Sequence, residues 1–306
     1  MNPGAVETHT LDGLSVAIRR WDPQRNGHVD PAAASPLLLV HGLGANTVSW
    51  LPVGQALADR RNAPVVALDL AGFGYTRSVG TNATIQRNAA LVIAALEQFG
   101  PSVVFGNSMG GAISIKVSAL RPDLVEGLVL VNPAVKPVFG SPQWRQAWLL
   151  SPMVFPHVGT RVIASRARQL GAEGMVDGTL QMVLEDPNSL DVSIRDEFVT
   201  IATERGTYPE AARAYADAAS SMFWYLVRNL DRDLARTLRI RPGLLVFGNR
   251  DRLVHISSAN ALRARHPDLD VAIFEGIGHA PQLEAPQVFV DAVDTWLRDR
   301  DLDQPN

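Results

Sequence analysis

The chain has 306 residues, enough for one large domain with an insertion or for two ordinary domains. With 46% hydrophobic residues, 19% charged residues and a net charge of −3, its composition is that of a soluble globular protein, and it lacks the cationic surface that nucleic acids or anionic membranes require. Cys is absent, which excludes disulfides and thiolate metal sites and is compatible with a reducing compartment.

Neither the N-terminus nor the apolar runs carry a targeting or spanning signal. The N-terminus has no basic patch followed by an apolar stretch. The longest suspicious run, residues 147–155, is far shorter than the ~20 residues that span a bilayer. We therefore expect a cytoplasmic protein without a membrane span.

The predicted strands are of two kinds. Residues 14–18 alternate apolar and small or polar side chains after a turn at residues 11–13, which predicts a half-buried strand. After a loop at residues 22–36, short apolar runs recur without alternation, which is typical of strands covered on both faces in a parallel sheet. These runs are residues 36–40, 64–70, 102–106, 125–131, 243–248 and 271–276.

Helical segments fall between these runs. Helices are predicted at residues 83–99, at 109–121 and from Pro286 onward, and this alternation indicates βαβ units in an open, doubly wound sheet. The alternation of strands and helices is interrupted once, between about residues 135 and 240, where the sequence has helix-like patches but no clear strand run. We therefore expect a core domain of residues 1–134 and 241–306, interrupted by a helical cap of residues 135–240.

Ser108 lies in the sequence GNSMGG, directly after the strand at 102–106 and before a helix. A G-x-S-x-G sequence in this setting is typical of a nucleophile elbow. Gly106 and Gly110 would remove side chains that otherwise collide with the neighbouring strand and helix. The N-terminus of the following helix favours developing negative charge. The pattern predicts that Ser108 is a nucleophile.

A serine hydroxyl needs a base to take its proton and a group to orient that base. Of the seven histidines, His279 follows the last apolar strand, at the sheet edge where ligands of open α/β sheets gather. Asp251 lies just beyond the preceding strand, so neighbouring strand ends can bring the two together. An acid after the strand that ends at Val131 is disfavoured, because that position is Asn132. We predict a triad of Ser108, Asp251 and His279.

Five motifs, in order and spacing, resemble the α/β-hydrolase family over essentially the whole chain. They are LLLVHGLG (37–44), DLAGFGYTRS (69–78), GNSMGG (106–111), GNRDRLV (248–254) and GIGHAPQLEAP (276–286). The resemblance implies an eight-stranded, mostly parallel sheet, a helical lid between strands six and seven, and a Ser–Asp–His triad. It also implies an oxyanion hole made by the backbone N–H groups of Leu43 and Met109. We interpret His41 as a brace for its loop, and Asp69 and Arg77 as structural.

Serine at the elbow distinguishes the chain from the haloalkane dehalogenases and epoxide hydrolases of this fold, which use Asp there. The first hypothesis is hydrolysis of a small to medium apolar carboxylic ester through an acyl-enzyme, with substrate and water as partners and with no metal or organic cofactor. Asn107 resembles the carbon–carbon bond hydrolases that cleave ring-fission products, so a ketone substrate stays open. The HGLG loop and Ala280 depart from that pattern. A cofactor-free perhydrolase and a non-catalytic ligand receptor are further alternatives.

Aromatic and Met side chains gather in residues 143–155 and 220–227, enough to wall an apolar pocket. We expect Trp148, Phe155, Phe223 and Trp224 to line it, although a cap helix also packs an apolar face on the core for purely structural reasons. The sequence does not indicate an oligomeric state.

Overall fold

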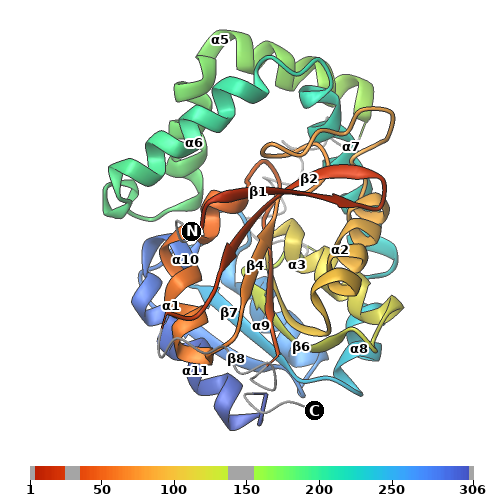
Figure 1. Ribbon diagram of the computed structural model, residues 1–306, viewed down its shortest axis with the longest axis vertical. Helices are drawn as coiled ribbons and strands as arrows, with labels where there is room; N and C mark the ends of the chain where they lie inside the picture. Colours follow the sequence, from red (N-terminus) through yellow and green to blue (C-terminus); the bar gives the residue numbers. More distant parts are fainter. Residues whose placement is uncertain (1–3, 25–34, 137–154, 303–306) are drawn as a thin grey trace.

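The computed structural model describes residues 4–24, 35–136 and 155–302. An eight-stranded sheet forms its centre, with the strand order β1-β2-β4-β3-β5-β6-β7-β8 (Figure 1). β1 pairs antiparallel with β2 and β2 with β4, and all other neighbours are parallel, which confirms the predicted sheet. The strands are β1 (Val6–Leu11), β2 (Leu14–Trp21), β3 (Leu37–Val40), β4 (Val65–Leu68), β5 (Ser102–Asn107), β6 (Val125–Val131), β7 (Gly243–Gly248) and β8 (Asp270–Phe274).

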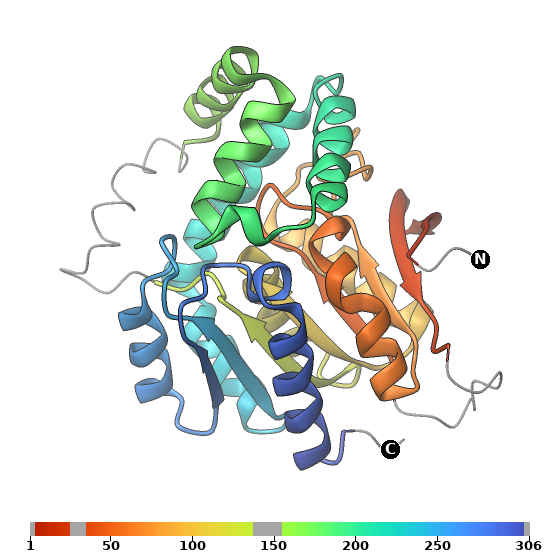
Figure 2. The ribbon, with the colours of Figure 1, turned by 90° about the vertical axis from the view of Figure 1, so that its left-hand side faces the viewer.

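Helices lie on both faces of the sheet (Figures 1 and 2). They are η1 (Thr47–Trp50), α1 (Leu51–Arg61), α2 (Ile85–Phe99), α3 (Met109–Leu120), α5 (Pro156–Val183), η3 (Pro187–Ser189), α6 (Val192–Arg205), α7 (Ala211–Arg228), α8 (Leu230–Leu238), α9 (Ile256–Arg265), α10 (Pro281–Glu284) and α11 (Pro286–Asp299). Among these helices, none is both long enough and apolar enough to cross a membrane.

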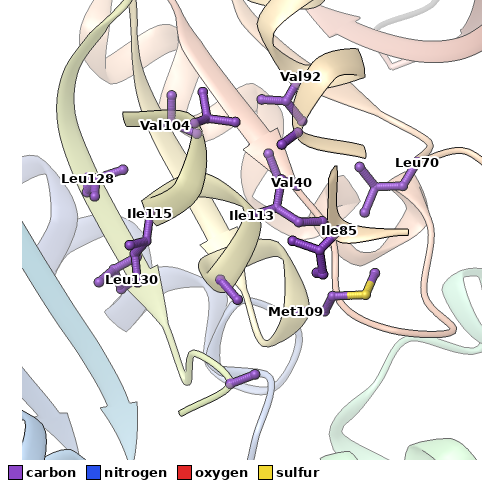
Figure 3. Close-up of a cluster of buried hydrophobic side chains, with 14 of the residues drawn as sticks. Val40, Leu70, Ile85, Val92, Val104, Met109, Ile113, Ile115, Leu128 and Leu130 are labelled. Atoms are coloured by element: carbon purple, nitrogen blue, oxygen red, sulfur yellow. The ribbon is translucent and has the colours of Figure 1, made fainter. Parts of the chain in front are cut away.

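Each parallel strand sends alternate side chains into two apolar layers, because successive residues of a strand point to opposite faces. Leu38 and Val40 of β3 belong to the layer beneath α2, α3, α8 and α9, whereas Leu37 and Leu39 belong to the layer beneath α1 and α11. Figure 3 shows Met109, at the start of α3, within the first layer. Burial on both faces explains why these strands read as unbroken apolar runs.

The predicted half-buried character of β2 is wrong. Ala17 and Arg19, which the alternation places on the polar face, are 5% exposed each. Arg19 is buried because its guanidinium has partners on three sides: the carbonyl of Gly4, the hydroxyl of Thr47 at 3.2 Å and the carboxylate of Glu197 on α6. A charged residue on a strand can therefore be buried when a distant helix supplies its counter-charge.

In the described part of the chain between β6 and β7, α5, α6, α7 and the shorter α8 follow one another (Figure 2). We name α5, α6 and α7 the cap helices; α5 is interrupted at Gly171, where φ is 65°. α8 falls inside the predicted insertion but packs against α3, with Leu230 and Leu234 in the core layer. The boundaries at residues 134/135 and 240/241 stay predictions.

Candidate active site

Ser108 occupies the turn between β5 and α3 with a φ of 54° and a ψ of −117°. Few residues other than Gly adopt such a backbone conformation, because it brings Cβ close to the neighbouring peptide groups. Hydrogen bonds hold it in place: the N–H of Ser108 donates to the carbonyl of Val131 at 3.0 Å, and its carbonyl accepts from Gly111 at 3.0 Å and from Ala134 at 2.9 Å. β6 and α3 thus fix the backbone of the predicted nucleophile from two sides.

The glycines around Ser108 are required by close packing. A Cβ atom on Gly110 would lie 2.2 Å from the carbonyl oxygen of Val40, and one on Gly106 would lie 2.5 Å from the backbone of Gly110. A Cβ atom on Gly111 would lie 2.8 Å from the side chain of Pro133. Only Gly lets the start of α3 approach β3 and β5 this closely. The packing that the sequence predicts for Gly106 and Gly110 is thus present.

Asp251 and His279 form the central hydrogen bond of the site. The Nδ1 atom of His279 lies 2.6 Å from Oδ2 of Asp251, and both residues are buried. The other carboxylate oxygen accepts the backbone N–H groups of Leu253 at 2.7 Å and Val254 at 2.9 Å. Burial raises the pKa of Asp251, but the charge and hydrogen bond of His279 outweigh it, so the pKa lies below its ordinary value. Asp251 therefore stays ionised at neutral pH and can fix the imidazole.

Asn132 is a site residue that the sequence analysis considered only as the wrong type for an acid. Its Nδ2 donates to Oδ2 of Asp251 at 2.7 Å, the same oxygen that His279 contacts. Its Oδ1 accepts the N–H of Gly248 at 3.2 Å, and its side chain is fully buried. The amide thus joins the ends of β6 and β7 and holds the carboxylate. The signal available in the sequence was its position, directly after a buried strand and beside the one that precedes Asp251.

A second amide, that of Asn107, ties the His279 loop to the elbow. Its Nδ2 donates to the carbonyls of Val131 at 3.1 Å and His279 at 3.2 Å. Since Asn107 directly precedes Ser108, this contact ties the backbone of the predicted base to the residue before the predicted nucleophile. Within the described chain, Nε2 of His279 is buried and has no hydrogen-bond partner. Among the described residues, this nitrogen therefore makes no hydrogen bond to Ser108.

The HGLG loop lies directly against the elbow. A Cβ atom on Gly42 would lie 3.1 Å from Cβ of Ser108, which places the neighbouring Leu43 beside the nucleophile. His41 braces this loop: its Nε2 accepts the N–H of Leu70 at 3.0 Å, so Nδ1 carries the proton and donates to the carbonyl of Gly42 at 2.8 Å. Burial lowers the pKa of His41 to about 4, so the ring is neutral. The role of Leu43 and Met109 as oxyanion donors stays a prediction.

Asp69 and Arg77 take up structural contacts, as the sequence suggests. Asp69 is fully buried and accepts the N–H groups of Thr47 and Tyr75, both at 2.8 Å. Arg77 is exposed and pairs with Glu210, just before α7, at 2.8 Å. Asp69 shapes the loop behind the site, and Arg77 joins that loop to the cap helices.

The predicted pocket residues lie at the surface of the cap helices. Phe155 is 65% exposed, and Phe223 and Trp224 on α7 are 38% and 43% exposed. The guanidinium of Arg228 lies 4.4 Å from the centre of the Trp224 ring. Trp148 is outside the described residues. A pocket role for these four side chains stays a prediction.

Tyr215 of α7 is the cap side chain that lies against the HGLG loop. A Cβ atom on Gly44 would lie 2.9 Å from the Tyr215 ring, and the centre of this ring lies 6.5 Å from that of Phe73. Burial raises the pKa of its hydroxyl. Sequence reasoning missed Tyr215 because nothing in its local pattern separates it from the other aromatic residues of the cap.

In the described ranges, no three His, Asp or Glu side chains gather as metal ligands.

The strained serine, the Asp–His pair on adjacent strand ends and the strand order together define a hydrolase of the doubly wound α/β class. The model of the "Alpha/beta hydrolase family" matches residues 37–292, and the chain belongs to this family.

Two relatives of the chain carry the names of different hydrolases. The chain is 27% identical to the 2-hydroxy-6-oxo-6-(2'-aminophenyl)hexa-2,4-dienoic acid hydrolase of Metapseudomonas resinovorans, over 89% of this chain and 87% of that one. It is also 27% identical to the pimeloyl-[acyl-carrier protein] methyl ester esterase of Cronobacter sakazakii, over 84% and 90%. A thermophilic esterase from Thermogutta terrifontis shares the fold, with a TM-score of 0.70, 20% identity and coverage of 98% and 100%. These comparisons do not decide between ester and carbon–carbon cleavage.

We predict that Asn132→Asp destabilises the protein by about 3 kcal/mol at pH 7, because it keeps the shape of the side chain but places a second carboxylate beside that of Asp251. Chemical denaturation measures the loss. The control is Asn260→Asp on the exposed face of α9, for which we expect a change within about 0.5 kcal/mol. Equal stability of the two variants would contradict the role of Asn132.

We predict that His41 makes stability depend on pH. Its pKa is about 4 in the folded protein against an ordinary 6.5, so the unfolded chain binds the extra proton between these values. The contribution is fully present above pH 6.5 and is lost as the pH falls toward 4, by about 3 kcal/mol. His41→Gln lacks this pH-dependent contribution to stability. The free energies of unfolding of wild type and variant should therefore converge as the pH falls toward 4. Parallel pH curves would show that His41 is not held neutral.

Proposed function

We propose that the protein hydrolyses carboxylic esters through an acyl-enzyme on Ser108. The observation that carries this proposal is the hydrogen bond of 2.6 Å between His279 and Asp251, in a loop that Asn107 ties to the elbow. An imidazole held by an ionised carboxylate on one nitrogen can act as a base through the other. Ser108 is half-exposed at the end of β5, where a substrate can reach it.

In the proposed reaction, Oγ of Ser108 attacks the ester carbonyl carbon and its proton moves to Nε2 of His279. The negative charge on the carbonyl oxygen is stabilised by the N–H groups of Leu43 and Met109, each by roughly 3 kcal/mol. The C–O bond then breaks, and the imidazolium gives its proton to the leaving alcohol. Water then attacks the acyl carbon and gives a proton to His279. The bond between that carbon and Oγ breaks, the imidazolium returns its proton to Oγ of Ser108, and the acid is released. Asp251 stabilises the imidazolium in both halves of the cycle.

Carbon–carbon bond hydrolysis is the second candidate, supported by Asn107 and by the relative from Metapseudomonas resinovorans. The contacts of Asn107 favour the ester hypothesis, because its amide nitrogen is used to join Val131 and His279. This structural task accounts for an Asn at that position without a role in cleaving a ketone. The chain has the same sequence identity, 27%, to the methyl ester esterase as to the dienoic acid hydrolase.

We predict that purified protein hydrolyses short-chain aryl esters faster than a vinylogous diketone acid, the ring-fission type of substrate. Ser108→Ala should lower kcat/KM by roughly 10⁴-fold or more, and Asp251→Asn by about 10³- to 10⁴-fold, since each removes a member of a cooperating unit. The control is Ser193→Ala at an exposed position of α6, and its kcat/KM should match that of wild type. Undiminished ester hydrolysis in Ser108→Ala would refute the mechanism, and faster turnover of the diketone acid would favour the second candidate.

A further inference from the structure

Glu284 lies five residues after His279, at the end of α10, and outside the triad. Its two carboxylate oxygens accept three backbone N–H groups. Oε2 accepts from Gly278 at 2.8 Å, and Oε1 accepts from Glu185 at 3.0 Å and from Asp186 at 2.9 Å. Gly278 directly precedes His279, whereas Glu185 and Asp186 follow α5. One side chain thus holds the histidine loop and a segment of the insertion together.

The same two segments meet through the backbone of the histidine itself. The N–H of His279 donates to the carbonyl of Val183, the last residue of α5, at 2.7 Å. A Cβ atom on Gly278 would lie 2.7 Å from that carbonyl oxygen and 2.8 Å from the nitrogen of Glu185. The backbones of the two segments are therefore so close that only Gly fits at this position. Figure 2 shows the chain after α5 beside the loop that precedes α10.

Apolar packing closes this junction on one side. A separate buried cluster is shared by the cap segment and the residues that follow His279 (Leu180, Leu184, Leu190, Ala280 and Leu283). Apolar contacts are not directional, so they bring the segments together without fixing the position of the imidazole. The directional contacts that reach the histidine loop include the hydrogen bonds to Glu284 and Val183.

We propose that Glu284 is a positioning residue for His279: by accepting N–H groups from both segments, it fixes the loop that aims the imidazole at Ser108. The proposal deepens the proposed function, since it rests on His279 acting as the base. Charge-assisted bonds to a carboxylate are roughly twice as strong as neutral ones, and here both oxygens are used. A Gln side chain offers one acceptor oxygen, and its NH₂ group faces the remaining donors. Gln therefore cannot satisfy both segments at once.

Arg252, which follows Asp251, also contacts this cap segment, at the carbonyl of Gln181 and at Glu185, both at 2.8 Å, whereas the contact between Glu210 and the core lies away from the base. Glu210 pairs with exposed Arg77 of the DLAGFGYTRS loop, and neither residue contacts the histidine loop through a hydrogen bond. An ion pair of this kind contributes little to stability. Glu210→Gln is therefore a matched control: it makes the same chemical change at another junction between cap and core.

The test compares Glu284→Gln, Glu284→Ala and Glu210→Gln with wild type. The first readout is the ¹H NMR signal of the Nδ1 proton of His279, assigned by its loss in Asp251→Asn, because it reports the imidazole without any substrate. The second is the rate at which a fluorophosphonate labels Ser108, and the third is kcat and KM for an aryl ester. All are measured well below the melting temperature of each variant.

We expect Glu284→Gln to shift and broaden the Nδ1 proton signal and to lower the labelling rate and kcat about 10-fold with little change in KM. Glu284→Ala should lower them by up to about 100-fold, as a misplacement of ~1 Å can do. Glu210→Gln should match wild type in all three readouts. If Glu284→Ala does not fold, Glu284→Gln carries the test.

An unchanged Nδ1 signal and labelling rate in Glu284→Gln would overturn the proposal, as would equal losses in Glu210→Gln, which would point to the cap in general. A lower melting temperature with unchanged kcat would also overturn it, because that is the mark of a purely structural residue. Failure of the proposed function looks different: wild type then hydrolyses no ester, while the Nδ1 signal still shows whether Glu284 positions the ring.

Discussion

The close approach of α3 to the sheet is the constraint on which the site depends. At Gly110 the helix backbone comes so near to β3 that a single methyl group would lie 2.2 Å from the carbonyl of Val40. With no space at Gly106 or Gly110, the chain can pass from β5 into α3 only through a sharp turn, and Ser108 takes the strained conformation at its apex. Hydrogen bonds from β6 and α3 keep it there. The strain therefore results from packing, and it presents the serine at the carboxyl edge of the sheet.

The rest of the site is a chain of hydrogen bonds in which each side chain fixes the position of the next. Asn107 joins the elbow to the loop of His279, Asn132 joins the end of β6 to Asp251, and Asp251 fixes the imidazole. On the outer side, Glu284 joins that loop to the segment after α5. The bonds of Asn107, Asn132 and Asp251 are buried, so the loss of either partner would leave a costly unsatisfied group, whereas those of Glu284 are only partly buried or exposed. These hydrogen bonds join the segment after α5 to the loop that carries the predicted base.

The sequence allowed the prediction of those features that follow from local pattern and from order along the chain. Buried strands read as apolar runs, and parallel strands end at the same edge, so Asp251 and His279 could be predicted to meet. Features that depend on long-range contacts could not be predicted. α1 is absent from the predicted helices, and its Gly54 is required by the ring of Trp21, which would lie 2.4 Å from a Cβ atom there. Arg19, Asn132 and Glu284 acquire their roles only from partners that are distant in sequence, or from loops whose course the pattern does not fix.

In the proposed reaction, Ser108 carries the acyl group during turnover. Mass spectrometry of the protein quenched early in the hydrolysis of an aryl ester detects this group. We expect the peptide containing Ser108 to gain the mass of one acyl group, which disappears as the substrate is consumed. Turnover without any acylated protein, or an acyl group on a different residue, would contradict the proposed reaction.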